Sequence, residues 1–250
     1  MISLWLVSLI CIGGLVWASL LNGLAHRLLK ERSLLEVGPK CTTCDQNLSL
    51  IDVLPLISHM IFGGKCRLCA SPISFLYPFV EFFGASVFVA LWYTRTCDYG
   101  QIWTLKLSVD LLFASALLLA LRTDLEEMVI LRVSSLYLIP VWWIGAAIGW
   151  LDISIAESFL GSLLGYLLPW VAGFFYKIWR GNDGIGVGDF ELLAMMGAFL
   201  GSAKMLDSLM IASVSGILVG FIYAVIHRDR MVRIPFGPFL ALGALIELFR

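Results

Sequence analysis

The stretch ISLWLVSLICIGGLVWASLLNGL, residues 2–24, decides the fold class. It carries no Asp, Glu, Lys or Arg and exceeds the about 20 apolar residues that a helix needs to cross a bilayer. No basic residue precedes it, whereas a secretory signal peptide has a basic segment ahead of its apolar run. His26, Arg27, Lys30 and Arg32 follow it instead. We therefore interpret this run as a retained membrane anchor.

The rest of the chain repeats this pattern of long apolar runs. They lie at residues 76–94, 102–121, 128–150, 155–176, 190–203, 206–226 and 235–249. Hydrophobic residues make up 60% of the chain and charged residues 14%, against about 25% charged in typical soluble domains. The net charge of -1 implies no electrostatic partner such as nucleic acid. We expect an all-α, polytopic transmembrane helical bundle of about eight spans.

The basic residues predict which loops face the cytoplasm. If the N-terminus lies outside, all but Arg95, Lys106, Lys204 and Arg250 of the 17 Lys and Arg fall on the inner side. The inner set is Arg27, Lys30, Arg32, Lys40, Lys65, Arg67, Arg122, Arg132, Lys177, Arg180, Arg228, Arg230 and Arg233. We therefore predict an outer N-terminus and a small cytoplasmic insertion at residues 25–75, the one long polar stretch.

Two CxxC pairs occupy this insertion, CTTC at residues 41–44 and CRLC at residues 66–69. Four thiolates from two such turns can surround Zn²⁺ tetrahedrally, and the spacing is close to that of zinc ribbons. A reducing cytoplasm favours metal over the alternatives, which are two disulfides or four free thiols. We expect Cys41, Cys44, Cys66 and Cys69 to bind a structural zinc ion, since four sulfur ligands leave no open coordination position.

Two carboxylates stand at the inner ends of apolar runs, where a charge is costly. Asp124 lies in LRTDLEE, residues 121–127, and Asp189 lies in GIGVGDF, residues 184–190. Two aspartates around one water can hydrolyse a peptide: one activates the water, and the other donates a proton to the departing amine. The alternative is that each aspartate is a helix cap or a solvated interfacial charge.

Five blocks in this order resemble the prepilin peptidases, the type IV prepilin leader peptidases of pilus, type II secretion and competence systems. They are GLVWASLLNGLAHRLL (14–29), the cysteine region 41–81 with DVLPLIS (52–58) and SPIS (71–74), Asp124, GVGD (186–189) and IPFGPFLALG (234–243). The resemblance implies three regions: a first transmembrane helix at 1–24, a cytoplasmic zinc-ribbon-like region at 25–75, and a transmembrane aspartyl peptidase core at 76–250.

The resemblance further implies two activities in the bacterial inner membrane. The first is cleavage of a prepilin or pseudopilin after its short basic leader, with Asp124 and Asp189 as the catalytic pair and without metal or covalent intermediate. The second is methylation of the freed α-amine with S-adenosylmethionine as methyl donor. The substrate would be a pilin helix in the bilayer. The donor-binding residues are not identified by any motif; Asp52 and Glu81 are hypotheses for binding the donor or the amine.

The sequence departs from the family pattern at two places. Members often have Pro-Asp shortly after the first aspartate, where this chain has Leu131-Arg132. They also commonly have Lys two residues after GxGD, where this chain has Glu191. An acidic group so close to Asp189 would raise the apparent pKa of the pair if it is not solvated.

Two other interpretations make different predictions. If the protein is a peptidase alone, a cleaved pilin receives no label from a labelled methyl donor. If it is a non-enzymatic membrane scaffold or transporter whose zinc loop docks a partner, Asp124→Asn and Asp189→Asn leave its activity in cells intact. A transporter would also show broken helices or polar residues at mid-membrane in matching halves, and the sequence has no such pairing.

Overall fold

The computed structural model describes residues 4–31, 38, 40–41, 43–99, 104–181, 184, 186–227 and 234–250. These residues form helices and turns, and among them the only β pairing is two isolated bridges in the cysteine region. The all-helical class is thereby confirmed. The chain packs into two compact units, Met1–Thr104 and Leu105–Arg250. This division does not test the three regions expected at 1–24, 25–75 and 76–250, which stay a prediction.

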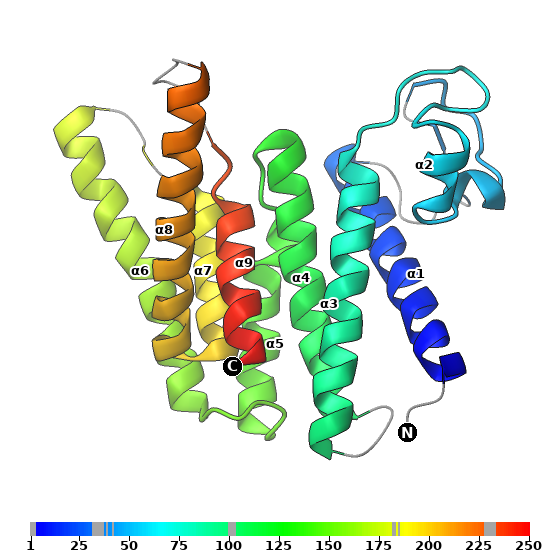
Figure 1. Cartoon of the computed structure of the whole chain (residues 1–250). Helices are drawn as coiled ribbons and strands as arrows, with labels where there is room; N and C mark the ends of the chain where they lie inside the picture. Colours follow the sequence, from blue (N-terminus) through cyan, green and yellow to red (C-terminus); the bar gives the residue numbers. More distant parts are fainter. Residues whose placement is uncertain are drawn as a thin grey trace. The chain divides into compact units, whose positions relative to one another are not determined.

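The first unit is a pair of long helices with the cysteine region between them in sequence. Figure 1 shows α1 (Leu4–Leu29) and α3 (Leu76–Tyr99) lying side by side, with η1 (Leu50–Val53) and α2 (Ile57–Ile61) in the connection. A Cβ on Gly14 of α1 would lie 3.2 Å from the Phe88 Cβ of α3. The small residue therefore permits the two helix backbones to approach closely.

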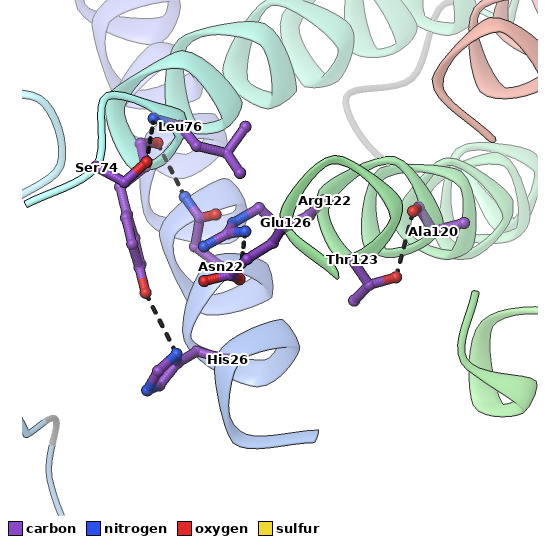
Figure 2. Close-up of polar contacts among 9 residues, drawn as sticks. Asn22, His26, Ser74, Leu76, Ala120, Arg122, Thr123 and Glu126 are labelled. Carbon is purple, nitrogen blue, oxygen red and sulfur yellow. Dashed lines mark hydrogen bonds and ion pairs between the residues drawn. The ribbon is translucent and has the colours of Figure 1, made fainter. Parts of the chain in front are cut away.

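Polar contacts also join α1 to the start of α3 (Figure 2). The buried amide of Asn22 donates from Nδ2 to the carbonyl oxygen of Tyr77 at 3.0 Å. One turn later, His26 Nδ1 lies 3.4 Å from the Tyr77 hydroxyl. Asn22 belongs to the first block of the resemblance, and its contact gives that position a structural role, because a buried amide needs hydrogen-bond partners.

The second unit contains the remaining helices (Figure 1). They are α4 (Leu105–Glu127), η2 (Arg132–Ser134), η3 (Leu136–Leu138), α5 (Ile139–Ala147), α6 (Ile155–Arg180), α7 (Val187–Leu200), α8 (Ser202–His227) and α9 (Gly237–Phe249). Gly161 of α6 and Gly197 of α7 face each other so closely that a Cβ on either would collide with the other's carbonyl oxygen. Ring stacking of Phe113 and Phe199, 3.9 Å between centroids, joins α4 to α7.

Four helices are long and apolar enough to cross a membrane among the described residues. Their spans are Trp5–Leu29, Leu76–Thr96, Ile155–Arg180 and Ser202–Ile226. The apolar run at 128–150 is instead divided into η2, η3 and the nine-residue α5, which rises only about 14 Å. The expected count of about eight spans is therefore not confirmed. Arg32, Arg228, Arg230 and Arg233, used above to orient the chain, lie outside the described residues.

Candidate active site and candidate metal centre

Both CxxC pairs fold into the same tight turn. The backbone N–H of Cys41 donates to the Gln46 carbonyl oxygen at 3.0 Å. The N–H of Cys66 donates to the Ser71 carbonyl oxygen, also five residues further on, at 2.9 Å. The residue after the second cysteine has a positive φ in each turn, 58° at Asp45 and 57° at Ala70. Positive φ is uncommon outside glycine. Its recurrence at equivalent positions indicates that both turns are shaped to bring their two cysteines together.

The four sulfur atoms form one cluster. One sulfur atom from each of Cys41, Cys44, Cys66 and Cys69 lies within 4.8 Å of all the others. The Cys41 and Cys69 Sγ atoms are 3.8 Å apart, far beyond the about 2.05 Å of a disulfide bond. A tetrahedral zinc ion with Zn–S bonds of about 2.3 Å needs sulfur atoms about 3.8 Å apart. The expected cysteines are thus together, unpaired, and at a separation suited to holding a metal ion.

Asp52 connects the cysteine region internally. The backbone N–H and the hydroxyl of Ser49 donate to its Oδ2 at 2.9 and 2.6 Å. Arg67, inside the second CxxC pair, donates to the same oxygen at 3.1 Å. The Ser49 hydrogen bonds, followed by the Arg67 charge, hold the pKa of the Asp52 carboxyl below its usual value. Asp52 therefore has a clear role in folding this region.

Glu81 supports the same region from α3. Its carboxylate is buried and accepts a hydrogen bond from the Leu56 backbone N–H at 2.9 Å. Leu56 has a φ of 59°, which is unfavourable for a branched side chain. A carboxylate that accepts its N–H helps to keep the backbone in this conformation, so Glu81 fixes the start of α2.

Asp124 stands in the last turn of α4 and is almost fully buried. Its Oδ2 accepts a hydrogen bond from the backbone N–H of Gly237, the first residue of α9, at 2.8 Å. The N-terminus of a helix carries a partial positive charge and favours an anion beside it. A Cβ on Gly237 would lie 2.8 Å from the same oxygen. Close approach of the α9 backbone to Asp124 therefore requires glycine at this position.

Asp189 stands in the first turn of α7 and lines a cavity together with Asp124. The cavity has a volume of about 230 Å³, enough for several water molecules. The other lining residues come from the segment after α4 and from the glycine-rich turn: Met128, Val129, Ile130, Gly186, Val187 and Gly188. A Cβ on Gly188 would lie 2.9 Å from the Ile130 Cβ. Glycine there allows α7 to approach the α4 segment closely.

The two carboxylates differ in their electrostatic environment, and both lie just outside the apolar runs 102–121 and 190–203. Burial, together with the negative charge of Asp124, raises the pKa of Asp189 to about 6. Burial also raises the pKa of Asp124, while the Gly237 hydrogen bond opposes this shift. The arrangement can therefore hold one proton on Asp189 and a negative charge on Asp124.

Two contacts near this cavity were not predicted from the sequence, the Gly237–Asp124 hydrogen bond and the Arg132–Glu191 ion pair. Gly237 was quoted as part of the IPFGPFLALG block, but nothing local marked its N–H as a partner of Asp124. Glu191 was expected to raise the apparent pKa of the pair if it is not solvated. In the structure it is buried, but Arg132 Nε lies 3.4 Å from its Oε1 and compensates the charge.

A second cavity of about 330 Å³ lies between α8 and α9 and is lined by Ser213, Gly216, Ile217, Ile234, Pro235, Phe236 and Phe239. It contains no carboxylate or other ionisable lining residue. Acid–base hydrolysis is therefore not supported there, and the Asp124–Asp189 cavity remains the candidate active site.

Comparison with known proteins agrees with the resemblance expected from the sequence. Residues 12–95 match the family described as "Bacterial Peptidase A24 N-terminal domain", and residues 111–221 match the "Type IV leader peptidase family". The first match spans the cysteine region, and the second spans both Asp124 and Asp189. No solved structure matches the chain.

Several curated relatives carry the name prepilin leader peptidase/N-methyltransferase. The chain is 31% identical to the one from Aeromonas hydrophila over 83% of its own length and 70% of the relative's. It is 30% identical to that of Pseudomonas aeruginosa over 94% of its own length and 87% of the relative's. It is 32% identical to the protein from Stutzerimonas stutzeri over 84% of its own length and 70% of the relative's.

Proposed function

The chain belongs to the type IV leader peptidase family and is a peptidase, and on that premise we propose that Asp124 and Asp189 are the catalytic pair that cleaves a prepilin leader. One observation carries this proposal: the two carboxylates, from different helices, line the same small cavity. The substrate is a prepilin or pseudopilin, presented from the bilayer with its basic leader at the inner surface.

Asp124 is the general base of the proposed reaction. The Gly237 N–H and the N-terminus of α9 favour its ionised form. It removes a proton from a water molecule in the cavity, and the water oxygen bonds to the scissile carbonyl carbon. Asp189 is the general acid, because its raised pKa lets it hold the proton that passes to the departing amine as the C–N bond breaks. A proton shift from Asp124 to Asp189 then restores the starting state.

Cleavage of a model prepilin in detergent tests this proposal. Asp124→Asn and Asp189→Asn should each reduce the rate on the order of 10²–10⁴-fold, the range for general acid–base groups. Asp152→Asn is the matched control, because Asp152 is an exposed aspartate between α5 and α6. Cleavage at the wild-type rate by either of the first two variants would remove that aspartate from the mechanism.

We infer that the cysteine cluster holds Zn²⁺ in a structural role. The four sulfur atoms of Cys41, Cys44, Cys66 and Cys69 have separations suited to a tetrahedral ion. Zinc bound to four thiolates has no open position for substrate, so it would stabilise the cysteine region without entering the cleavage reaction. Metal analysis of the purified protein should find one zinc ion per chain.

The second activity we propose is N-methylation of the newly freed amine by S-adenosylmethionine, as the names of the relatives indicate for those proteins. The contacts of Asp52 and Glu81 support folding of the cysteine region. They do not mark either residue as a binding site for the methyl donor. Incubation of a cleaved pilin with labelled methyl donor tests the activity. Absence of transferred label would leave the protein a peptidase alone.

We propose a bacterial inner-membrane location with a periplasmic N-terminus and with the cysteine region and both aspartates on the cytoplasmic side. The four apolar helices fit a membrane protein of this family, and the distribution of Lys and Arg supports the orientation. Protease access to residues 40–73 in inside-out but not in right-side-out vesicles tests it.

A further inference from the structure

Glu191 lies two residues after Asp189 on α7, and its side chain is only 7% exposed. A buried carboxylate needs compensation, and two side chains from the segment after α4 supply it. Arg132 Nε is 3.4 Å from Glu191 Oε1, and the Ser135 hydroxyl, which also lies 3.2 Å from the Leu131 carbonyl oxygen, is 3.4 Å from Glu191 Oε2. Both contacts cross from the segment that follows Asp124 to the helix that carries Asp189.

The ion pair joins the two elements whose spacing sets the cavity. The segment after α4 supplies Met128, Val129 and Ile130 to the cavity wall, and α7 supplies Asp189. The Arg122–Glu126 pair, at 2.6 Å, lies within α4 and cannot restrain α4 relative to α7 (Figure 2). The Arg132–Glu191 pair can restrain these two elements, because Arg132 lies in the segment after α4 and Glu191 lies in α7.

We propose that Arg132 and Glu191 are positioning residues: their ion pair holds the segment after α4 against the start of α7 so that Asp124 and Asp189 share one water. Arg132 is 65% exposed but Glu191 is 7% exposed, so solvent screens the pair on one side only, and reversing either charge should lower the unfolding temperature as well as the cleavage rate. The neutral variant Glu191→Gln leaves no unpaired buried charge and therefore separates the effect on cleavage from the effect on stability. This inference rests on the catalytic pair proposed above.

Charge exchange tests the inference with the full chain and a model prepilin. Arg132→Glu and Glu191→Lys each place two like charges together, and kcat should fall on the order of 10- to 100-fold with KM little changed, since a displacement of about 1 Å can have this effect. The double variant Arg132→Glu with Glu191→Lys restores the attraction, and its kcat should return to within about threefold of wild type.

The control exchanges an ion pair at the opposite end of α4. Lys106 pairs with Asp152 there, and Lys106→Glu, Asp152→Lys and their double variant should leave kcat unchanged. Glu191→Gln keeps the size and the Ser135 contact but removes the charge. It should reduce kcat several-fold at an unchanged unfolding temperature, and it provides the test if the charge-reversed single variants do not fold.

The inference is overturned if the double variant is as slow as the slower single variant, or if Glu191→Gln is folded and has the wild-type kcat. Asp124→Asn in the same assay distinguishes a failure of the positioning role from a failure of the proposed catalytic pair. If Asp124→Asn cleaves normally, the proposed function is wrong whatever the charge exchange does. If it is inactive and the exchange fails, only the positioning role is wrong.

Discussion

The cysteine cluster and the carboxylate cavity are both polar sites, but they are assembled from different lengths of chain. Each cysteine turn closes within a few residues, as the bond from Cys41 N to Gln46 O illustrates. The cavity instead joins Asp124 of α4 to Asp189 of α7, with a backbone N–H from Gly237 of α9. The first site depends on local spacing and the second on helix packing. Changes to the first should act on folding, and changes to the second on catalysis.

The largest effect on folding should come from losing a cysteine. Cys66→Ser removes a buried sulfur from the cluster. Structural zinc sites contribute about 10 kcal/mol or more to the folding of small domains. We expect loss of bound zinc and fast hydrogen exchange across residues 40–73. Cys11→Ser on α1 is the control and should retain the metal. Full zinc content in the Cys66 variant would exclude Cys66 as a ligand.

Gly237→Ala should have the next largest effect, on catalysis. The added Cβ would lie 2.8 Å from Asp124 Oδ2, so the carboxylate or α9 must move. A displacement of about 1 Å lowers kcat on the order of 10²-fold. Gly13→Ala is the matched control, because a Cβ there meets no atom within 4 Å. An unchanged cleavage rate in the Gly237 variant would show that Asp124 and α9 accommodate the added Cβ and that glycine is not required at this position.

Asp189→Asn should stabilise the protein while inactivating it. The pKa of Asp189 is raised from 3.8 to about 6, so the folded state holds this proton more tightly than the unfolded state. Stability from this group therefore decreases as pH rises between these values. Asparagine does not ionise and has no such loss. The free energy of unfolding of Asp189→Asn should therefore exceed that of the wild type by about 2–3 kcal/mol at pH 7.5 and by little near pH 4. Thermal unfolding at both pH values measures this, with Asp152→Asn as the control. A pH-independent difference would contradict it.

Asp52→Asn should have the smallest effect, confined to the cysteine region. The pKa of Asp52 is lowered, so its ionised form stabilises the folded state above the ordinary value of 3.8. That contribution is lost as pH falls through the lowered pKa. We expect a small decrease in unfolding temperature at pH 7, weaker in high salt because Arg67 is partly exposed. An equal decrease in high salt would point to packing instead of charge.

The same contrast explains what the sequence could predict. Helical class followed from the apolar runs, and the cysteine cluster followed from the two CxxC spacings, because both signals are local. The count of spans was less predictable: hydropathy alone does not reveal that the run at 128–150 is broken into short turns and α5.

The cavity was only partly predictable for a related reason. Asp124 and Asp189 stood out as carboxylates beside apolar runs, and the structure brings them to one cavity. Gly237 acts through its backbone N–H, which every residue except proline possesses, so its identity carried little signal. Arg132 and Glu191 appeared as separate departures, since their pairing depends on how α7 packs beside the segment after α4.

The most direct test of the central claim compares cleavage by Asp124→Asn, Asp189→Asn and the double variant in one assay. Residues that act as one catalytic unit are strongly non-additive. We predict that each single variant loses nearly all activity and that the double variant is no slower than the worse single one. If the losses multiply, or if either single variant cleaves at the wild-type rate, Asp124 and Asp189 do not share one water.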